Sequence, residues 1–268
     1  MTPLMKQSLR AVSPSLYRLL RDRYREYAPY NRLVRHIAGG LDWNVESGPF
    51  AGMKYLPGFC EGILPKLLGS YEQELWPALH SIASLPIQAV INIGCAEGYY
   101  AVGLARLLPN ATIYAFDCLP TARDATRRAA EVNHVTARIR IAGACDSATL
   151  ATLPLEGALV VIDCEGAEFE ILDPSVAPGL AASWLLVELH DFVDCRITPA
   201  LRARFSSTHE IEIIKAAVRE PGLFPALAGL AAPQQTMALN EDRHWKGVPE
   251  RSQWAFMAPR PRQKEERQ

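Results

Sequence analysis

Polar side chains stand in or just after short apolar runs across the middle of the sequence. Asn92 lies in the first run, Asp117 follows the second, and Asp163 follows a later one. Another run ends with Glu188 and His190, which are two residues apart and so project from one face of a strand. Carboxylates accept hydrogen bonds from sugar hydroxyls, and histidine titrates near neutral pH. These residues could therefore bind a polar ligand and move a proton.

A turn of mostly small residues, 94–98, follows the first run. Small residues let a ligand approach the backbone and the start of the next helix. Dinucleotide-binding turns need a third small residue where this chain has Tyr99, so the bulky ring disfavours a nicotinamide cofactor. Asp117 would bind a ribose in either cofactor class.

Apolar runs alternate with helical patterns from about residue 86 onward, which indicates βαβ units and a parallel sheet. Seven strands are expected, at 89–93, 112–116, 138–142, 159–162, 184–189, 210–214 and 253–257. Helices are expected at 99–108, 121–133, 168–172 and 199–206. Ligands of such sheets bind beyond the carboxyl ends of the strands, where the polar residues above are placed.

Residues 1–85 are predicted to form a helical extension ahead of this core. It would contain an amphipathic basic helix at 15–27, a small strand or hairpin at 50–55 and a helix at 64–83. The basic helix could pack on the core with its charges in solvent, or contact an anionic partner. Its pattern is compatible with both roles.

The catalytic domain is predicted to cover 86–260, followed by a disordered tail at 261–268. The stretch 221–249 separates the last two strands by more than a tight hairpin needs, so it should carry an inserted helix or lid. Within it, Arg243 could contact an anion or lie in a solvated loop.

Composition bounds the partners and the compartment. With 268 residues, 49% of them hydrophobic, the chain can bury one sizeable core with a modest appendage. A formal net charge of −1 gives no global field that would gather nucleic acid or an anionic membrane. The six cysteines are widely spaced, as expected for reduced thiols rather than a zinc site. Without a signal peptide or a membrane span, we expect a cytoplasmic protein, with self-association left open.

Four segments together resemble FkbM-type methyltransferases of the Rossmann-like superfamily. They are 90–100, 114–117, 161–168 and 187–190. The third is the most specific, because it is similar to the D-x-E-G-A-E signature that follows the fourth strand in that family. The resemblance covers about 69–191 and implies a seven-stranded methyltransferase sheet whose last strand is antiparallel.

The resemblance implies S-adenosylmethionine as the cofactor. Carried over by position, Gly94, Ala96 and Gly98 would lie along its methionine moiety. Asp117 would bind the ribose, and Asp146 would approach the adenine amino group. The full set expected at the cofactor is Tyr71, Glu72, Asn92, Gly94, Ala96, Glu97, Gly98, Tyr99, Asp117, Cys118, Asp146, Asp163 and Cys164.

Two positions leave alternatives. Many relatives have an acid where this chain has Asn92, and that acid helps to hold the cofactor's ammonium group. Glu97 could compensate, or Asn92 could act through water. Ahead of the core, Tyr71 and Glu72 are placed over the cofactor by the resemblance, whereas ordinary helix capping by Ser70 is the competing interpretation.

Methylation of a hydroxyl requires a base, and His190 is the first choice because it titrates near neutral pH. Glu188 or Asp163 would orient its ring, which makes these three the predicted catalytic residues; a purely structural histidine is the alternative. The carboxylates could instead bind a divalent metal ion, which we do not expect because no spacing demands one. Glu168 is assigned to the first turn of the next helix, where its charge complements the dipole.

The predicted function is therefore S-adenosylmethionine-dependent O-methylation of a small-molecule or saccharide hydroxyl in a biosynthetic pathway. N-methylation is one alternative, and a catalytically inactive cofactor-binding or scaffold protein, suggested by Asn92, is another. A nicotinamide oxidoreductase is a remote alternative. No nucleic-acid partner and no stable membrane insertion are expected.

Overall fold

The computed structural model describes residues 13, 15, 16, 18, 29–57, 62–241 and 253–261. Most of the predicted 15–27 helix lies outside the described residues, as do Cys60, Arg243 and positions 262–268 of the tail. In the described part of the chain, no helix combines the length and apolar character needed to cross a membrane.

The described strands form one seven-stranded sheet in the order β3-β2-β1-β4-β5-β7-β6. Their bounds are β1 Ala89–Ile93, β2 Thr112–Phe116, β3 Ile139–Ala142, β4 Leu159–Ile162, β5 Trp184–Leu189, β6 His209–Lys215 and β7 Gln253–Pro259. The strands β1 to β5 pair in parallel, while β7 runs antiparallel to both β5 and β6. The predicted methyltransferase-type sheet is confirmed, and the order reverses between β1 and β4.

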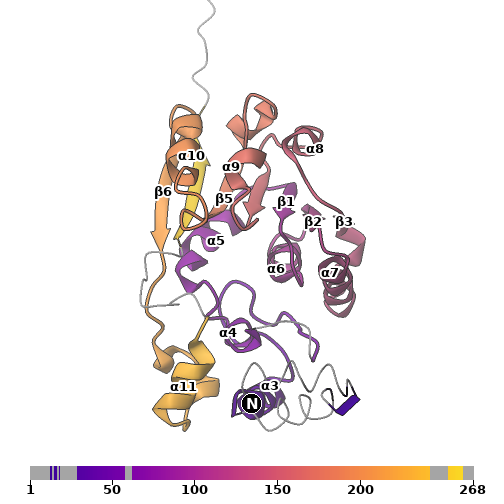
Figure 1. Cartoon of the computed structure of the whole chain (residues 1–268), viewed down its shortest axis with the longest axis vertical. Coiled ribbons are helices and arrows are strands. Elements are labelled where there is room, and N and C mark those ends of the chain that lie inside the picture. The colour runs from indigo at the N-terminus through magenta and orange to yellow at the C-terminus, as the bar shows by residue number, and fades with distance from the viewer. Residues whose placement is uncertain are drawn as a thin grey trace, which may run out of the picture.

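Helices cover both faces of the sheet (Figure 1). One face packs against α5 (Trp76–Ala83), α6 (Tyr99–Leu107) and α7 (Pro120–Val132). The other packs against α8 (Ser147–Ala151), α9 (Glu168–Ile171) and α10 (Ile197–Phe205). The central strands β1 and β4 are wholly buried, which explains why all of their residues except Asn92 are apolar.

The alternation of side chains along the strands brings the polar residues onto one face. Val90, Val161 and Leu186 belong to the core cluster on the α5–α7 side. Side chains two residues farther along project from the same face. Asn92 on β1 and Glu188 on β5 therefore point to the face of the sheet that packs against α6.

The predicted helix at 64–83 is wrong as a single element. The structure has α4 (Ile63–Leu68), the 3-10 helix η1 (Gln73–Leu75) and α5. Gly69 ends α4 in the left-handed conformation, with φ of 82°, and a Cβ there would lie 2.1 Å from the Ser47 carbonyl oxygen. The helix stops because a distant segment passes too close for any residue except glycine.

Of the predicted strand or hairpin at 50–55, the described residues form a short antiparallel pairing: a bridge joins Asn44 to Lys54, and the Val45 N–H donates to the Met53 carbonyl at 2.8 Å. Asn133 holds the same segment from the end of α7: its side chain accepts from the Lys54 N–H and donates to the Lys54 carbonyl, each at 2.8 Å. Phe50 and Met53 are buried in the main core.

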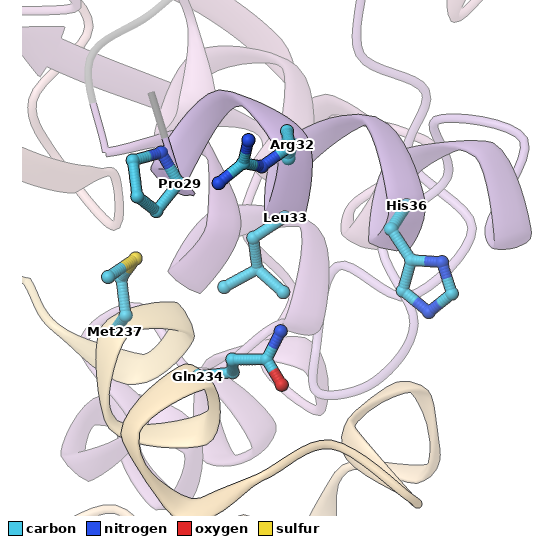
Figure 2. A pocket seen from close by; sticks show the side chains of 6 residues that line it. All are labelled: Pro29, Arg32, Leu33, His36, Gln234 and Met237. Carbon is cyan, nitrogen blue, oxygen red and sulfur yellow. The ribbon is translucent and has the colours of Figure 1, made fainter. Parts of the chain in front are cut away.

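A helical group lies at one end of the molecule, formed by α3 (Pro29–Gly40), α4 and α11 (Ala232–Leu239), as Figure 1 shows. The stretch 221–249 between β6 and β7 contains α11, which confirms the predicted inserted helix. It also contains η4 (Pro221–Leu223) and η5 (Pro225–Leu227). A pocket of about 300 Å³ lies between α3 and α11 (Figure 2). Its lining residues are Pro29, Arg32, Leu33, His36, Gln234 and Met237. None of them belongs to the predicted site.

Candidate cofactor and acceptor site

The turn after β1 is fixed by the chain itself. The N–H groups of Gly94 and Cys95 both donate to the Phe116 carbonyl at 2.9 Å, which ties the turn to the end of β2. Gly94 has φ of 80°, and a Cβ there would lie 1.8 Å from the Asp163 carbonyl oxygen. The first requirement for glycine is therefore the approach of the chain after β4, rather than the approach of a ligand.

Gly98 and Tyr99 set the start of α6. Gly98 is left-handed, and a Cβ would lie 3.2 Å from the Cα of Thr126 on α7. The buried Tyr99 ring packs edge-on against Phe50 and Tyr71, with centroid distances of 5.1 Å in both cases. Tyr99 thus belongs to a group of packed aromatic rings at the start of α6.

Hydrogen bonds from backbone N–H groups fix both carboxylate oxygens of Asp117. Its Oδ2 accepts the Ala96 N–H at 2.9 Å, and its Oδ1 accepts the Leu119 N–H at 2.8 Å. A carboxylate oxygen can accept more than one hydrogen bond, so capacity for hydroxyl donors remains. Cys118 is exposed and the Leu119 side chain is 59% exposed, which places an apolar surface beside the acid. This combination suits a ribose next to a flat base.

Asp146 has a structural partner. Its Oδ1 accepts the Thr149 N–H at 2.7 Å, so it caps the start of α8. The hydrogen bonds from the Thr149 side chain and backbone hold the pKa of Asp146 below 3.8. The predicted adenine contact would have to use the remaining oxygen.

Asn92 carries an unused acceptor. The residue is buried, and its Oδ1 has no hydrogen-bond partner among the described residues. Buried polar atoms usually have partners, so this oxygen fits a donor that the chain does not supply, such as an ammonium group. Glu97 is already paired, since its carboxylate forms a buried ion pair with Lys66. Lys66 competes with any ammonium for Glu97.

The competing interpretation, helix capping by Ser70, is wrong: its hydroxyl donates to the Pro65 carbonyl at 3.4 Å and caps no helix start among the described residues. Glu72 has φ of 50° and is buried, and its carboxylate accepts a hydrogen bond from the Tyr100 hydroxyl. Burial, followed by the charge of Asp163, raises the pKa of Glu72 well above 4.5. Tyr71 covers Tyr99 edge-on.

Four carboxylates surround His190, whose side chain is only 4% exposed. The Nδ1 atom lies 2.7 Å from Oε1 of Glu168. The Nε2 atom lies 3.6 Å from Glu165, 3.7 Å from Asp163 and 3.8 Å from Glu188, beyond hydrogen-bond distance. The predicted grouping of His190 with Asp163 and Glu188 is present. The prediction that one of these two orients the ring is wrong, because Glu168 makes that hydrogen bond.

The electrostatics follow from this arrangement. Burial lowers the pKa of His190, but the hydrogen bond and charge of Glu168, with the charges of Asp163 and Glu165, outweigh it and raise the pKa above 6.5. Burial and the charge of Asp163 raise the pKa of Glu188 well above 4.5. A protonated Glu188 hydrogen-bonded to Asp163 is the arrangement that this pair favours.

One group of side chains in the described ranges has the spacing for a metal ion. Ligand atoms of Asp163, Glu165 and His190 all lie within 4.8 Å of one another. Glu165 is 83% exposed, and exposed acids with this spacing are common without a metal. The remaining predicted residue, Cys164, is half-buried, and its Sγ would lie 3.6 Å from a Cβ on Gly94.

Sequence reasoning missed Glu168 as a member of this site. It places the residue correctly at the start of α9, but the side chain turns back toward β5 instead of facing solvent. The available signal was the signature segment 163–168 itself, which contains three acids around a glycine.

No family model matches the chain, and no curated protein matches it, so the FkbM-type resemblance is not confirmed. Two solved structures illustrate the similarity. The O-methyltransferase TomG from Streptomyces achromogenes, a complex with S-adenosylmethionine, has 14% identity and a TM-score of 0.47 over 87% of this chain and 89% of its own. An rRNA methylase from Streptococcus thermophilus has 10% identity and a TM-score of 0.48 over 70% and 97%. The methyltransferase-type fold rests on the strand order, and the function is argued from the site.

Proposed function

We propose that this chain is an S-adenosylmethionine-dependent methyltransferase that methylates a hydroxyl of a small-molecule or saccharide acceptor. The observation that carries the proposal is that Asp163 connects the turn after β1, at 94–98, to the carboxylates around His190. Asp163 donates its backbone N–H to Ile93 at 3.0 Å, and its carbonyl packs against Gly94, while its carboxylate faces His190. A proton acceptor thus stands beside the turn at the centre of the sheet.

The residues present fit this cofactor. The orphan oxygen of Asn92 would accept from its ammonium group, the oriented Asp117 from its ribose, and Leu119 with Cys118 would line its base. When bound, the cofactor supplies an activated methyl group on a sulfonium. Asp163 and Cys164 would contact it from the β4 side.

His190 performs the proton transfer in this proposal. Its Nε2 accepts the proton of the acceptor hydroxyl, while its Nδ1–H continues to donate a hydrogen bond to Glu168. The imidazolium that forms is stabilised by Glu168, Asp163 and Glu165. Glu188 shares a proton with Asp163 and lies 3.8 Å from Nε2, so it would bound the space that the acceptor hydroxyl occupies.

The FkbM-type assignment is part of the same proposal. Its support is that the signature segment surrounds one histidine: Asp163 and Glu165 face Nε2, and Glu168 holds Nδ1. The segment therefore has a joint chemical role rather than three separate ones.

The experiment is a methyl-transfer assay that detects S-adenosylhomocysteine with a panel of hydroxylated acceptors, including saccharides, and with amines as the contrast. Turnover with hydroxyl acceptors is expected, and His190→Gln should reduce kcat by roughly 10²–10⁴-fold while cofactor binding persists. Methylation of amines with full activity in the variant would reject O-methylation by this base.

A further inference from the structure

We propose that Glu168 is the positioning residue of this site, fixing the ring and the tautomer of His190 so that the Nε2 lone pair faces the acceptor. The inference rests on the proposed function, in which His190 is the base. Glu168 does not touch the reacting atoms; it acts through the imidazole.

The carboxylate of Glu168 is immobilised by its surroundings. Its side chain is 0% exposed, and one oxygen, Oε1, receives the His190 Nδ1 at 2.7 Å and the N–H groups of Cys164 at 3.1 Å and Gly166 at 3.2 Å. Left-handed backbone at Glu165 and Gly166, with φ of 53° and 113°, turns the segment so that these N–H groups point inward. The oxygen that holds the ring is thus held by its own loop.

The burial of Glu168 is costly in a way that a role in folding alone does not explain. Its second oxygen, Oε2, is buried without a hydrogen-bond partner among the described residues. Leaving a buried acceptor without a hydrogen bond destabilises the fold, so a stability role alone would favour a residue without that oxygen. A charged group retained at this cost is typical of functional sites.

The tautomer follows from donor and acceptor chemistry. An ionised carboxylate only accepts hydrogen bonds, so Nδ1 of His190 must carry the proton and Nε2 carries the lone pair in the neutral ring. The hydrogen bonds from His190 and the loop hold the pKa of Glu168 below 4.5 despite its burial, which keeps it ionised. Among the described residues, the other carboxylates paired with the ring, those of Asp163, Glu165 and Glu188, lie on the Nε2 side.

The test combines kinetics with ¹⁵N NMR of histidine-labelled protein, in which His190→Gln assigns the ring signals. Wild type above the pKa of His190 should show the Nδ1–H tautomer. Glu168→Gln should reduce kcat by roughly 10²–10³-fold, because a neutral amide no longer dictates the tautomer, with KM for the cofactor changed by less than about threefold. Glu168→Asp, which keeps the charge, should recover part of kcat.

Glu170→Gln is the matched control, because Glu170 lies exposed on the same helix and should leave kcat and the spectrum unchanged. Unchanged kcat in Glu168→Gln, or an Nε2–H tautomer in wild type, would overturn the inference. The wild-type spectrum tests the tautomer of His190 even if Glu168→Gln fails to fold. It also needs no turnover: a chain that shows the expected tautomer but methylates nothing would refute the proposed function and leave the positioning intact.

Discussion

Replacement of Gly94 by alanine tests whether the turn is built by the chain or left open for a ligand. The new Cβ would lie 1.8 Å from the Asp163 carbonyl oxygen, whereas real Cβ atoms essentially never come closer than 3.0 Å. The turn after β1 and the segment after β4 would have to separate by more than 1 Å, taken as the difference of these two distances. Both segments are backbone, so no side chain can rotate away.

Two other glycines separate the contributions to this cost. Gly157 has φ of 69°, and a Cβ on it would meet nothing within 4 Å, so Gly157→Ala should lose only the left-handed strain of about 1–2 kcal/mol. Gly143 has open space and no left-handed backbone, so Gly143→Ala should stay within about 0.5 kcal/mol of wild type. Gly94→Ala adds a backbone clash to the strain and should lose at least about 4 kcal/mol.

Urea denaturation of the three variants measures these free energies of unfolding without any cofactor. The expected order of destabilisation is Gly94→Ala, then Gly157→Ala, then Gly143→Ala. A Gly94→Ala variant no less stable than Gly157→Ala would refute the close packing of the turn on the chain after β4. It would also remove the structural link between the cofactor turn and Asp163.

Three further predictions concern charges. Asn92→Asp should bind S-adenosylmethionine about fivefold more tightly by calorimetry, because a carboxylate is a stronger ammonium partner than an amide; weaker binding would contradict the role given to the orphan oxygen. Arg219→Met should lower the free energy of unfolding by about 3–5 kcal/mol, because Arg219 is only 8% exposed and pairs with Glu74 at 2.6 Å and with a second buried acid. The exposed Arg127→Met should change it by less than about 1 kcal/mol, and equal effects would show that the buried network is dispensable. Finally, kcat/KM should fall about tenfold per pH unit as pH drops below the pKa of His190, which lies above 6.5, since only the neutral base is active; a flat profile through that range would exclude it.

The strands could be predicted because their signal is local. Buried parallel strands read as apolar runs, and β1, β2, β4 and β5 begin and end at the predicted residues. The error at 64–83 arose where a distant group decides the backbone, since Gly69 ends a helix because of the Ser47 carbonyl. The Lys54 backbone likewise bonds to Asn133, 79 residues away. No local pattern contains those contacts.

The site shows the same division. The strand ends predicted that Asp163, Glu188 and His190 would meet, because parallel topology brings those ends together. The orientation of the ring could not be predicted, since it depends on the turn at Gly166 that directs Glu168 inward. The pairing of Glu97 with Lys66 could not be predicted either, because it joins residues that lie 31 positions apart in the sequence.

Calorimetric titration of the folded chain with S-adenosylmethionine tests the central claim most directly. We expect one binding site per chain, with affinity reduced about tenfold or more in Asp117→Ala, because its oriented carboxylate would accept the ribose hydroxyls. A cooperatively folded wild-type chain that binds no S-adenosylmethionine would contradict the proposed methyltransferase function.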